Sequence, residues 1–211
     1  MIKVTFLGTS GSTPTKERSL PAVALEYDGD VYIFDCGEGM QRQAMDYSVN
    51  ISKIKAIFIS HTHGDHILGL PGLIRTMALN RRMHPLEIYV PAGEENKVHI
   101  LLTFDKALIG YKIIVKGVKS GVICKGDGFK VSAFKLNHTV PTYGYAFESE
   151  DRNRFIKDKC AKLGIKGTMF GDLSRKGTIK IKNKTIKLKD VTYVVPGNKI
   201  VYAADTRPTV S

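Results

Sequence analysis

The sequence predicts an α/β fold in which short buried strands alternate with helices. Short apolar runs recur along the chain, and segments with helical spacing lie between them. Clusters of glycine and proline separate these segments, as turns and loops require. Of the 211 residues, 43% are apolar and 25% are charged, which is the composition of a globular protein and excludes a disordered or fibrous chain.

The first predicted elements are strands. Residues 2–7 alternate in a strand pattern, and residues 22–27 and 31–34 are predicted to pair as a hairpin across Asp28-Gly29-Asp30. The next elements in chain order are a helix over 38–47, a strand over 55–60, a helix over 67–80, a strand over 86–90, a helix over 94–108, and strands over 111–118, 121–124, 129–136, 143–147 and 199–203.

A basic segment interrupts this pattern. Between Asp151 and Asp190 the chain has thirteen Lys or Arg against four Asp, an excess of +9 out of a formal net charge of +12. Because strands resembling core strands lie on both sides, residues 149–190 are predicted to form an inserted arm that protrudes from the domain. Its charge favours a polyanion such as nucleic acid, with a merely solvated lysine-rich surface as the alternative.

Within this arm, the pattern predicts three pieces of local structure. Residues 152–163 are expected to form a basic helix that ends at Gly164, and residues 167–177 are punctuated by glycine. Residues 178–188 alternate isoleucine with lysine around Asn183, which predicts a small hairpin that buries little surface.

The three cysteines, Cys36, Cys124 and Cys160, lie far apart and without CxxC spacing. This argues against a disulfide framework or a thiolate metal site and favours a reducing cytoplasm. The first residues have the pattern of a strand instead of an export leader, and no apolar run approaches the roughly 20 residues needed to cross a bilayer. We therefore expect a soluble cytoplasmic protein with no membrane partner.

The most informative segment is Ser60-His61-Thr62-His63-Gly64-Asp65-His66, which follows a predicted buried strand. Imidazole nitrogens and carboxylate oxygens are ligands that zinc accepts. Side chains two residues apart in an extended segment point the same way, so His61, His63 and Asp65 are expected to share one side. The adjacent Asp65 and His66 diverge and can reach a second ion. A polar surface loop is the alternative, but such a density of ligands argues against it.

Two further residues complete the predicted metal site. His138 follows one strand and Asp205 ends another. A carboxylate at such a position can bridge two ions roughly 3.5–4 Å apart. Asp35 also follows a strand, and two roles stay open for it: supporting a ligand histidine or capping a helix. His84 and His99 have no ligand neighbours and are expected on the surface.

The histidine string resembles the signature of the metallo-β-lactamase superfamily, whose fold is an αββα sandwich with metals at one edge. Within that superfamily the chain is similar to ribonuclease Z, the endonuclease family that removes 3′ trailers from precursor tRNA. The motifs that carry this similarity span the chain in family order: Leu7-Gly8-Thr9-Ser10-Gly11 with Pro14-Thr15, Asp35-Cys36-Gly37-Glu38-Gly39, Gly69-Leu70-Pro71-Gly72-Leu73, His138-x-Val140-Pro141-x-x-Gly144-Tyr145, and Asp205-Thr206-Arg207-Pro208.

This resemblance implies a site for two zinc ions. The implied ligands are His61, His63 and His138 for one ion, Asp65 and His66 for the second, and Asp205 as the bridge. Asp65 would also be the general base. The implied reaction is attack of a metal-activated hydroxide on a phosphodiester, which leaves a 3′-hydroxyl on the tRNA and a 5′-phosphate on the trailer.

The basic insertion resembles the family's flexible arm, an exosite that grips the tRNA elbow. The residues expected to contact RNA are Lys157, Lys159, Lys162, Lys166, Arg175 and Lys176. Residues 163–168 align with the arm's glycine-proline segment, but Lys166 and Thr168 stand where prolines are usual, which predicts a less rigid loop. The family also implies a homodimer in which one subunit's arm serves the other's active site.

The resemblance departs from the family pattern at the C-terminal side. The family continues for roughly another hundred residues, a length within one domain's range, and that portion supplies the last histidine ligand and a histidine proton donor. We therefore expect residues 1–211 to form a metallo-β-lactamase-like domain that is incomplete at the C-terminus. A chain ending at Ser211 is expected to bind the second zinc weakly and to have much reduced nuclease activity.

Two alternatives to a tRNA nuclease stay open. The first is another hydrolase of the same fold that acts on small esters or phosphodiesters, since the histidine cluster fits it equally well. The second is a catalytically incomplete RNA-binding fragment. The basic arm favours RNA as the substrate, because a small molecule has no use for it.

Overall fold

The computed structural model describes residues 2–103, 109–181 and 184–208, which divide into two compact units. The first unit contains Met1–Lys125, Val131–Phe147 and Val201–Ser211, and the second contains Gly126–Lys130 and Glu148–Ile200. The arm predicted over residues 149–190 lies within the second unit; that it protrudes stays a prediction. None of the helices in the described residues is long and apolar enough to span a membrane.

The larger sheet of the first unit has six strands in chain order. They are β1 (Ile2–Gly8), β2 (Ala22–Tyr27), β3 (Asp30–Phe34), β4 (Ile54–Phe58), β5 (Leu86–Pro91) and β6 (Ile113–Val118). The first three strands are antiparallel, and β3 to β6 are parallel. The predicted hairpin is confirmed: Asp28 and Gly29 both have positive φ angles, 52° and 85°, which a two-residue turn between twisted strands requires.

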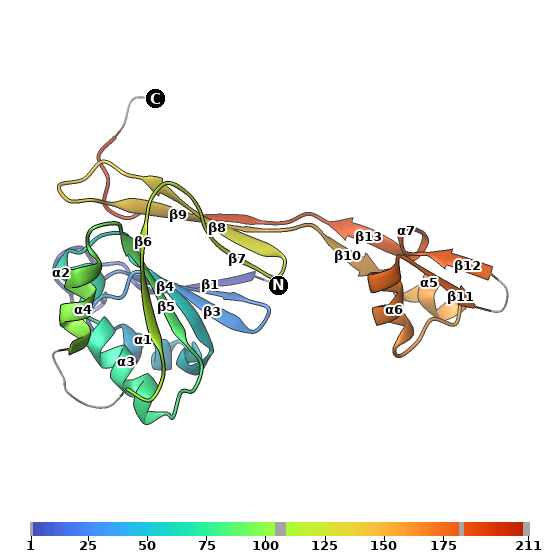
Figure 1. Cartoon of the computed structure of the whole chain (residues 1–211), viewed down its shortest axis with the longest axis horizontal. Helices are drawn as coiled ribbons and strands as arrows, with labels where there is room; N and C mark the ends of the chain where they lie inside the picture. Colours follow the sequence, from blue (N-terminus) through green and yellow to red (C-terminus); the bar gives the residue numbers. More distant parts are fainter. Residues whose placement is uncertain (1, 104–108, 182–183, 209–211) are drawn as a thin grey trace. The chain divides into compact units, whose positions relative to one another are not determined.

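Helices cover one face of this sheet, and Figure 1 shows α1, α3 and α4 beside it. Their bounds are α1 (Met40–Asp46), α2 (Gly64–Ile67), α3 (Leu70–Leu79) and α4 (Glu95–Thr103), with a 3₁₀ turn at Ile51–Lys53. Apolar side chains of the helices, such as Leu73 and Met77, share a buried cluster with sheet residues such as Ile57 and Ile88. Burial of this stripe supplies most of the helices' stability.

Aromatic side chains fill the opposite face of the six-stranded sheet. The second sheet has the order β14-β9-β8-β7, with β7 (Gly121–Gly126), β8 (Phe129–Lys135), β9 (Tyr143–Ser149) and β14 (Lys199–Tyr202). The Tyr145 ring lies 5.4 Å from that of Phe58, and the Tyr202 ring stacks on Phe34 at 5.5 Å. The first unit is therefore layered, with helices, a six-stranded sheet and strands of a second sheet.

The second unit has a small core of its own. Its elements are β10 (Arg152–Phe155), α5 (Lys157–Lys162), α6 (Met169–Lys176), β11 (Thr178–Ile181), β12 (Lys184–Lys187), α7 (Leu188–Val191) and β13 (Thr192–Val195). Strand β10 pairs with β13, and β11 pairs with β12. The buried core residues are Cys160, Ile165, Leu173, Ile186 and Val191.

The structure corrects several local predictions in this unit. Residues 152–163 are not one helix: the first four form β10, because β13 supplies a pairing partner almost forty residues later in the chain. Residues 167–177, predicted only as glycine-punctuated, contain α6, whose Leu173 is fully buried. The hairpin predicted over 178–188 is confirmed, and it buries Ile186 despite the expectation that it buries little. Its Asn183 lies outside the described residues, as do residues 104–108 of the helix predicted over 94–108.

Candidate metal centre

All six predicted metal ligands belong to the first unit, and they follow the ends of its strands. His61 and His63 come after β4, and the hydroxyl of Tyr145 donates a hydrogen bond to the carbonyl of Ile59 at 2.6 Å, which holds the end of that strand. His138 follows β8 and Asp205 follows β14. Residues from three distant parts of the chain, which follow strands of both sheets, therefore meet at one place.

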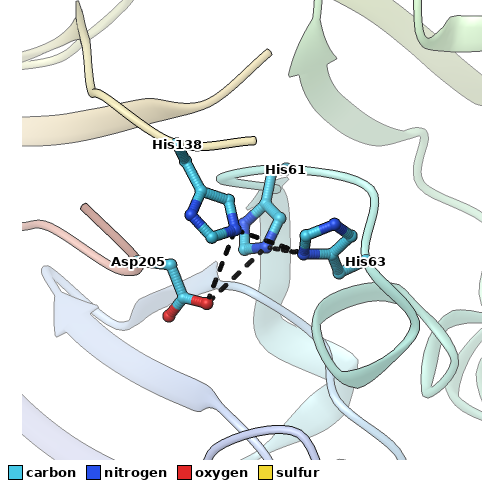
Figure 2. A group of neighbouring side chains, drawn as sticks. All are labelled: His61, His63, His138 and Asp205. Carbon is cyan, nitrogen blue, oxygen red and sulfur yellow. Dashed lines mark hydrogen bonds and ion pairs between the residues drawn. The ribbon is translucent and has the colours of Figure 1, made fainter. Parts of the chain in front are cut away.

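Four of these side chains converge on a common point, as Figure 2 shows. One potential ligand atom from each of His61, His63, His138 and Asp205 lies within 4.8 Å of all the others. His63 Nδ1 lies 3.0 Å from His61 Nε2 and 3.3 Å from His138 Nε2. Asp205 Oδ2 lies 3.8 Å from His138 Nε2 and 4.0 Å from His61 Nε2. Three imidazoles and one carboxylate are a donor set suited to a zinc-like ion.

The other two predicted ligands form a second group beside the first. His66 Nε2 lies 3.4 Å from Asp65 Oδ2 and 4.0 Å from Asp205 Oδ1. Asp205 thus directs one carboxylate oxygen to each group, which is the arrangement of a bridging ligand. Asp65 thus lies with His66 and not with His61 and His63, which differs from the extended pattern predicted for residues 61–65. The chain turns into α2 at Gly64, which moves Asp65 away from the two preceding histidines and beside His66.

Asp35 is the hydrogen-bonding hub behind this centre. It is fully buried, and its Oδ1 accepts the backbone N–H of Ser60 at 2.6 Å. Its Oδ2 accepts the Ser60 hydroxyl at 2.7 Å, His66 Nδ1–H at 2.7 Å and the Tyr202 hydroxyl at 2.6 Å. Of the two roles left open by the sequence, the support of a histidine is the one observed, because α1 is preceded by Gly39 without a side-chain cap.

This hub fixes which nitrogen of each histidine faces the centre. His66 donates Nδ1–H to Asp35, so in the neutral ring its Nε2 keeps a lone pair. The single Ser60 proton also goes to Asp35, so His61 Nδ1, at 2.9 Å from the Ser60 oxygen, must be the donor in that contact. Both tautomers follow from the network, and both leave Nε2 free to bind a cation.

The electrostatics of the two buried histidines differ. Burial, together with the neighbouring His66, lowers the pKa of His61 to about 4, so its imidazole is neutral. Burial also lowers the pKa of His66, but the hydrogen bond to Asp35 and the nearby carboxylates outweigh it and raise the net pKa above the usual value. Additional positive charge beside His66, such as a bound cation, would oppose that protonation.

One buried atom tests whether a cation fits here. Among the buried side-chain nitrogen and oxygen atoms of the described residues, His66 Nε2 is the one that lacks a hydrogen-bond partner. A buried polar atom without a partner costs about 1–3 kcal/mol. A metal ion that accepts this lone pair, with Asp65 and Asp205 as neighbouring ligands, would remove that cost. The residues present therefore fit a bound divalent cation.

Close backbone contacts hold the loops that carry the ligands. A Cβ added at Gly37 would lie 2.5 Å from the carbonyl oxygen of Asp65, and one added at Gly69 would lie 2.2 Å from the carbonyl oxygen of Gly37. Only glycine permits these approaches. The N–H of Ser12 also donates to Asp65 Oδ2 at 2.9 Å and orients that carboxylate.

Four supporting residues were not predicted from the sequence. Ser60 and Tyr202 bind Asp35 as described above, and Thr62 donates to Glu94 Oε2 at 2.6 Å on the outer side of the histidine loop. The position of Ser60 inside the histidine string was a signal that could have indicated its role. Tyr202 and Glu94 offer no such signal. As predicted, His84 and His99 are exposed.

Known proteins are similar to this chain in both sequence and fold. The family model described as anti-Pycsar protein Apyc1 matches residues 2–162, so the chain also falls within that sequence family. The ribonuclease Z of Natronomonas pharaonis is 39% identical over 99% of this chain and 69% of its own length. The ribonuclease Z of Thermococcus kodakarensis is 41% identical over 99% of this chain and 67% of its own length.

These relatives match nearly the whole chain, including the residues after 162 that the Apyc1 model leaves unmatched. The chain belongs to the ribonuclease Z family. It is thereby a member of a family of metal-dependent endoribonucleases, which confirms the enzyme class and the family predicted from the motifs.

Solved structures confirm the predicted fold of this ribonuclease Z family member. Human tRNase Z, short form, superposes with a TM-score of 0.64 and 32% identity, covering 70% of this chain and 64% of the human one. The metallo-β-lactamase fold protein YhfI from Bacillus subtilis superposes with a TM-score of 0.58 at 23% identity, covering 69% and 57% of the two chains. The chain thus spans about two thirds of the length of its ribonuclease Z relatives and of the human structure.

Proposed function

We propose that this chain acts as a zinc-dependent endoribonuclease that removes the 3′ trailer from precursor tRNA. The observation that carries the proposal is the convergence of His61, His63, His138 and Asp205 beside the unpartnered Nε2 of His66. Membership of the ribonuclease Z family supports tRNA as the substrate class. The metal pair, the cleavage point and the role of each ligand belong to this proposal.

In the proposed centre, His61, His63 and His138 would hold one zinc ion and Asp65 and His66 would hold the other, and Asp205 would contribute to both. When bound, the ions would supply positive charge that lowers the pKa of water and stabilises the phosphodiester as charge develops on it. The buried Asp35 network serves to present both Nε2 lone pairs without rearrangement.

The proposed reaction is hydrolysis of one P–O3′ bond. The oxygen of water bonds to phosphorus while the P–O3′ bond breaks, so the trailer receives a 5′-phosphate and the tRNA keeps a 3′-hydroxyl. Asp65 is proposed to accept the proton that water loses, and a proton must reach O3′ as it leaves. The Ser12 N–H holds the Asp65 carboxylate in place for this role.

The second unit is proposed to bind the RNA backbone. Gly164-Ile165-Lys166-Gly167 joins α5 to α6, and both glycines have positive φ angles, 72° and 55°. A G-x-x-G loop between two helices is the arrangement by which KH modules clamp four backbone nucleotides. Ile165 is buried in the unit's core while Lys166 is exposed. The core therefore anchors the loop at Ile165, directly before the exposed ammonium group of Lys166.

The six basic side chains predicted to contact RNA are all exposed: Lys157, Lys159, Lys162, Lys166, Arg175 and Lys176. Exposure leaves them available for phosphates, although Arg175 donates to Asp172 at 2.7 Å and is partly neutralised. We therefore assign Lys166 the leading part in this proposed contact. The homodimer and the cytoplasmic location stay predictions, which sedimentation and localisation of the tagged protein would test.

A hydrolase of a small ester or phosphodiester is the second candidate. The match of residues 2–162 to the Apyc1 family model favours it, because that match includes five of the six proposed metal ligands and ends inside the arm. The two candidates differ in their use of the arm. Turnover of bis-p-nitrophenyl phosphate should not change when the arm is altered, whereas cleavage of precursor tRNA should fall.

The proposed function is tested with a precursor tRNA that carries a labelled 3′ trailer. The chain loaded with zinc should release the trailer with a 5′-phosphate, and Asp65→Asn should reduce cleavage by about 10²–10⁴-fold, the usual contribution of a general base. The matched control is Asp46→Asn on the exposed surface of α1. Slow cleavage still supports the proposal if it is lost in Asp65→Asn while tRNA binding is retained. No cleavage, or cleavage indifferent to Asp65, contradicts it.

A further inference from the structure

Tyr202 is the most distant contributor to the Asp35 hub. It lies at the end of β14, 167 residues after Asp35 in the sequence, and its hydroxyl donates to Asp35 Oδ2 at 2.6 Å. Its ring stacks on Phe34, the residue before Asp35, with centroids 5.5 Å apart and an angle of 26° between the planes. The tyrosine therefore contacts this loop through both its ring and its hydroxyl.

The Tyr202 hydroxyl is the third donor to one oxygen atom, Asp35 Oδ2. Asp35 Oδ2 already accepts the Ser60 hydroxyl and His66 Nδ1–H, each at 2.7 Å. A carboxylate oxygen has two lone pairs, so the three donors must share them, and together they restrain the position of this oxygen. Without the third donor, the carboxylate gains freedom to turn away from His66.

Asp35 itself has an unusual backbone that depends on its surroundings. Its φ angle is 57°, in the left-handed region that residues other than glycine rarely occupy. Such a conformation persists where neighbouring contacts determine it. Among the described residues, Ser60, His66 and Tyr202 donate to the Asp35 side chain, and of these three only Tyr202 comes from the second sheet.

Tyr202 is also linked to the bridging ligand through the chain. Asp205 follows it by three residues, and Asp205 is half exposed with contacts near 4 Å to the histidines. The end of β14 is therefore fixed on the buried side by the Tyr202 hydroxyl just before the chain reaches Asp205. Tyr202 thus connects β14, which leads to Asp205, with Asp35, which orients His66.

We propose that Tyr202 is a positioning residue of the metal centre, whose hydroxyl on Asp35 Oδ2 keeps His66 in the tautomer that presents Nε2 and holds β14 so that Asp205 reaches both ion positions. This inference rests on the proposed function for the identity of the metal. The contact itself concerns the metal-free protein, so it can be tested there.

The test uses Tyr202→Phe, which removes the hydroxyl and keeps the ring that stacks on Phe34. The matched control is Tyr111→Phe: Tyr111 is a buried tyrosine of the first unit, and its hydroxyl donates to the backbone carbonyl of Ile74 at 3.1 Å. In the metal-free proteins, at a pH high enough to keep the His66 ring neutral, ¹⁵N spectra of labelled histidine report the His66 tautomer. Competition with a chromogenic chelator then measures the affinity for zinc of each protein.

In the wild type and the control we expect His66 with its proton on Nδ1, and in Tyr202→Phe a mixture of both tautomers. The affinity for the more weakly held zinc should fall about 10-fold in Tyr202→Phe, as for other residues that orient a ligand, and stay unchanged in Tyr111→Phe. An unchanged tautomer or an unchanged affinity in Tyr202→Phe overturns the inference, and so does an equal loss in the control.

The same experiment separates this inference from the proposed function. A wild-type chain that binds no zinc contradicts the proposed function. The tautomer comparison in metal-free protein then decides the inference by itself, since it needs no ion. Thermal unfolding of both variants with a chelator present shows whether their losses of stability are equal, in which case a difference in zinc affinity arises from positioning.

Discussion

The metal centre and the basic arm hold their polar side chains in opposite ways. In the centre, His61 is 0% and His66 is 1% exposed, and Asp35 connects both through Ser60 or directly. In the second unit, the six basic side chains proposed to contact RNA are all exposed around a core of five buried residues. Coordination requires fixed distances, whereas attraction between lysine and phosphate acts over several ångströms and tolerates movement. Buried hydrogen bonds therefore restrain the proposed metal ligands, whereas the basic side chains of the second unit are simply exposed.

The largest expected effect is at the hub of the rigid region. Asp35→Ala removes the acceptor for four donors and leaves His66 without its charged partner inside the core. We expect the free energy of unfolding to fall by about 3–5 kcal/mol and the affinity for zinc to fall about 100-fold. Urea unfolding with a chelator and zinc titration measure the two quantities.

Asp30→Ala is the control for that change. It removes a partly exposed carboxylate whose ion pair with Lys55 spans 3.6 Å at the surface, and such pairs contribute about 0–1 kcal/mol. If Asp35→Ala were no more damaging than Asp30→Ala, the hub would be dispensable and the contrast between the two regions would fail.

The next effect concerns the core of the second unit. Leu173→Ala truncates a fully buried side chain of α6, which costs about 2–5 kcal/mol in a packed core. Because this core is small, we expect hydrogen exchange to lose protection across residues 152–195 while zinc affinity changes by less than about 3-fold. The control is Leu163→Ala, at a side chain that is 37% exposed. A parallel loss of zinc would show that the two units are not independent.

The smallest expected effect is at a single exposed charge. Lys166→Ala should weaken binding of precursor tRNA only several-fold and reduce the slope of log K against log salt by about one, as the loss of one phosphate contact predicts. Filter binding over a range of salt concentrations measures this. Lys119→Ala, an exposed lysine of the first unit, is the charge-matched control. An unchanged slope for Lys166→Ala would remove this residue from the RNA contact.

Local signals predicted much of the first unit. Strand β2 has the predicted bounds and β3 begins one residue earlier, because alternation and the Asp-Gly turn are properties of neighbouring residues. The convergence of His61, His63, His138 and Asp205 was also predictable, since each ligand follows a recognisable strand and the family motifs place the four together. That Asp65 and His66 hold a second ion stays a prediction, although the two side chains do lie together, with His66 Nε2 3.4 Å from Asp65 Oδ2.

Features that depend on long-range contacts could not be predicted from the sequence. Strand β10 could not be distinguished from a helix because its partner β13 lies far along the chain. The extended reading of residues 61–65 failed at Gly64, where α2 begins after His63. The role of Tyr202 depends on a contact across 167 residues, and no local pattern carries that information.

The order of the ligands along the chain decides when the centre can assemble. A ribosome releases His61 and His66 early, together with the strands and helices that bury them, and N-terminal parts of a protein begin to fold first. Tyr202 and Asp205 emerge only after the whole second unit has been synthesised. A nascent chain therefore has most of its histidines in place while the carboxylate oxygens of Asp205, the proposed bridge, are still missing. In the proposed centre, capture of the second ion would wait until translation has passed the last strand.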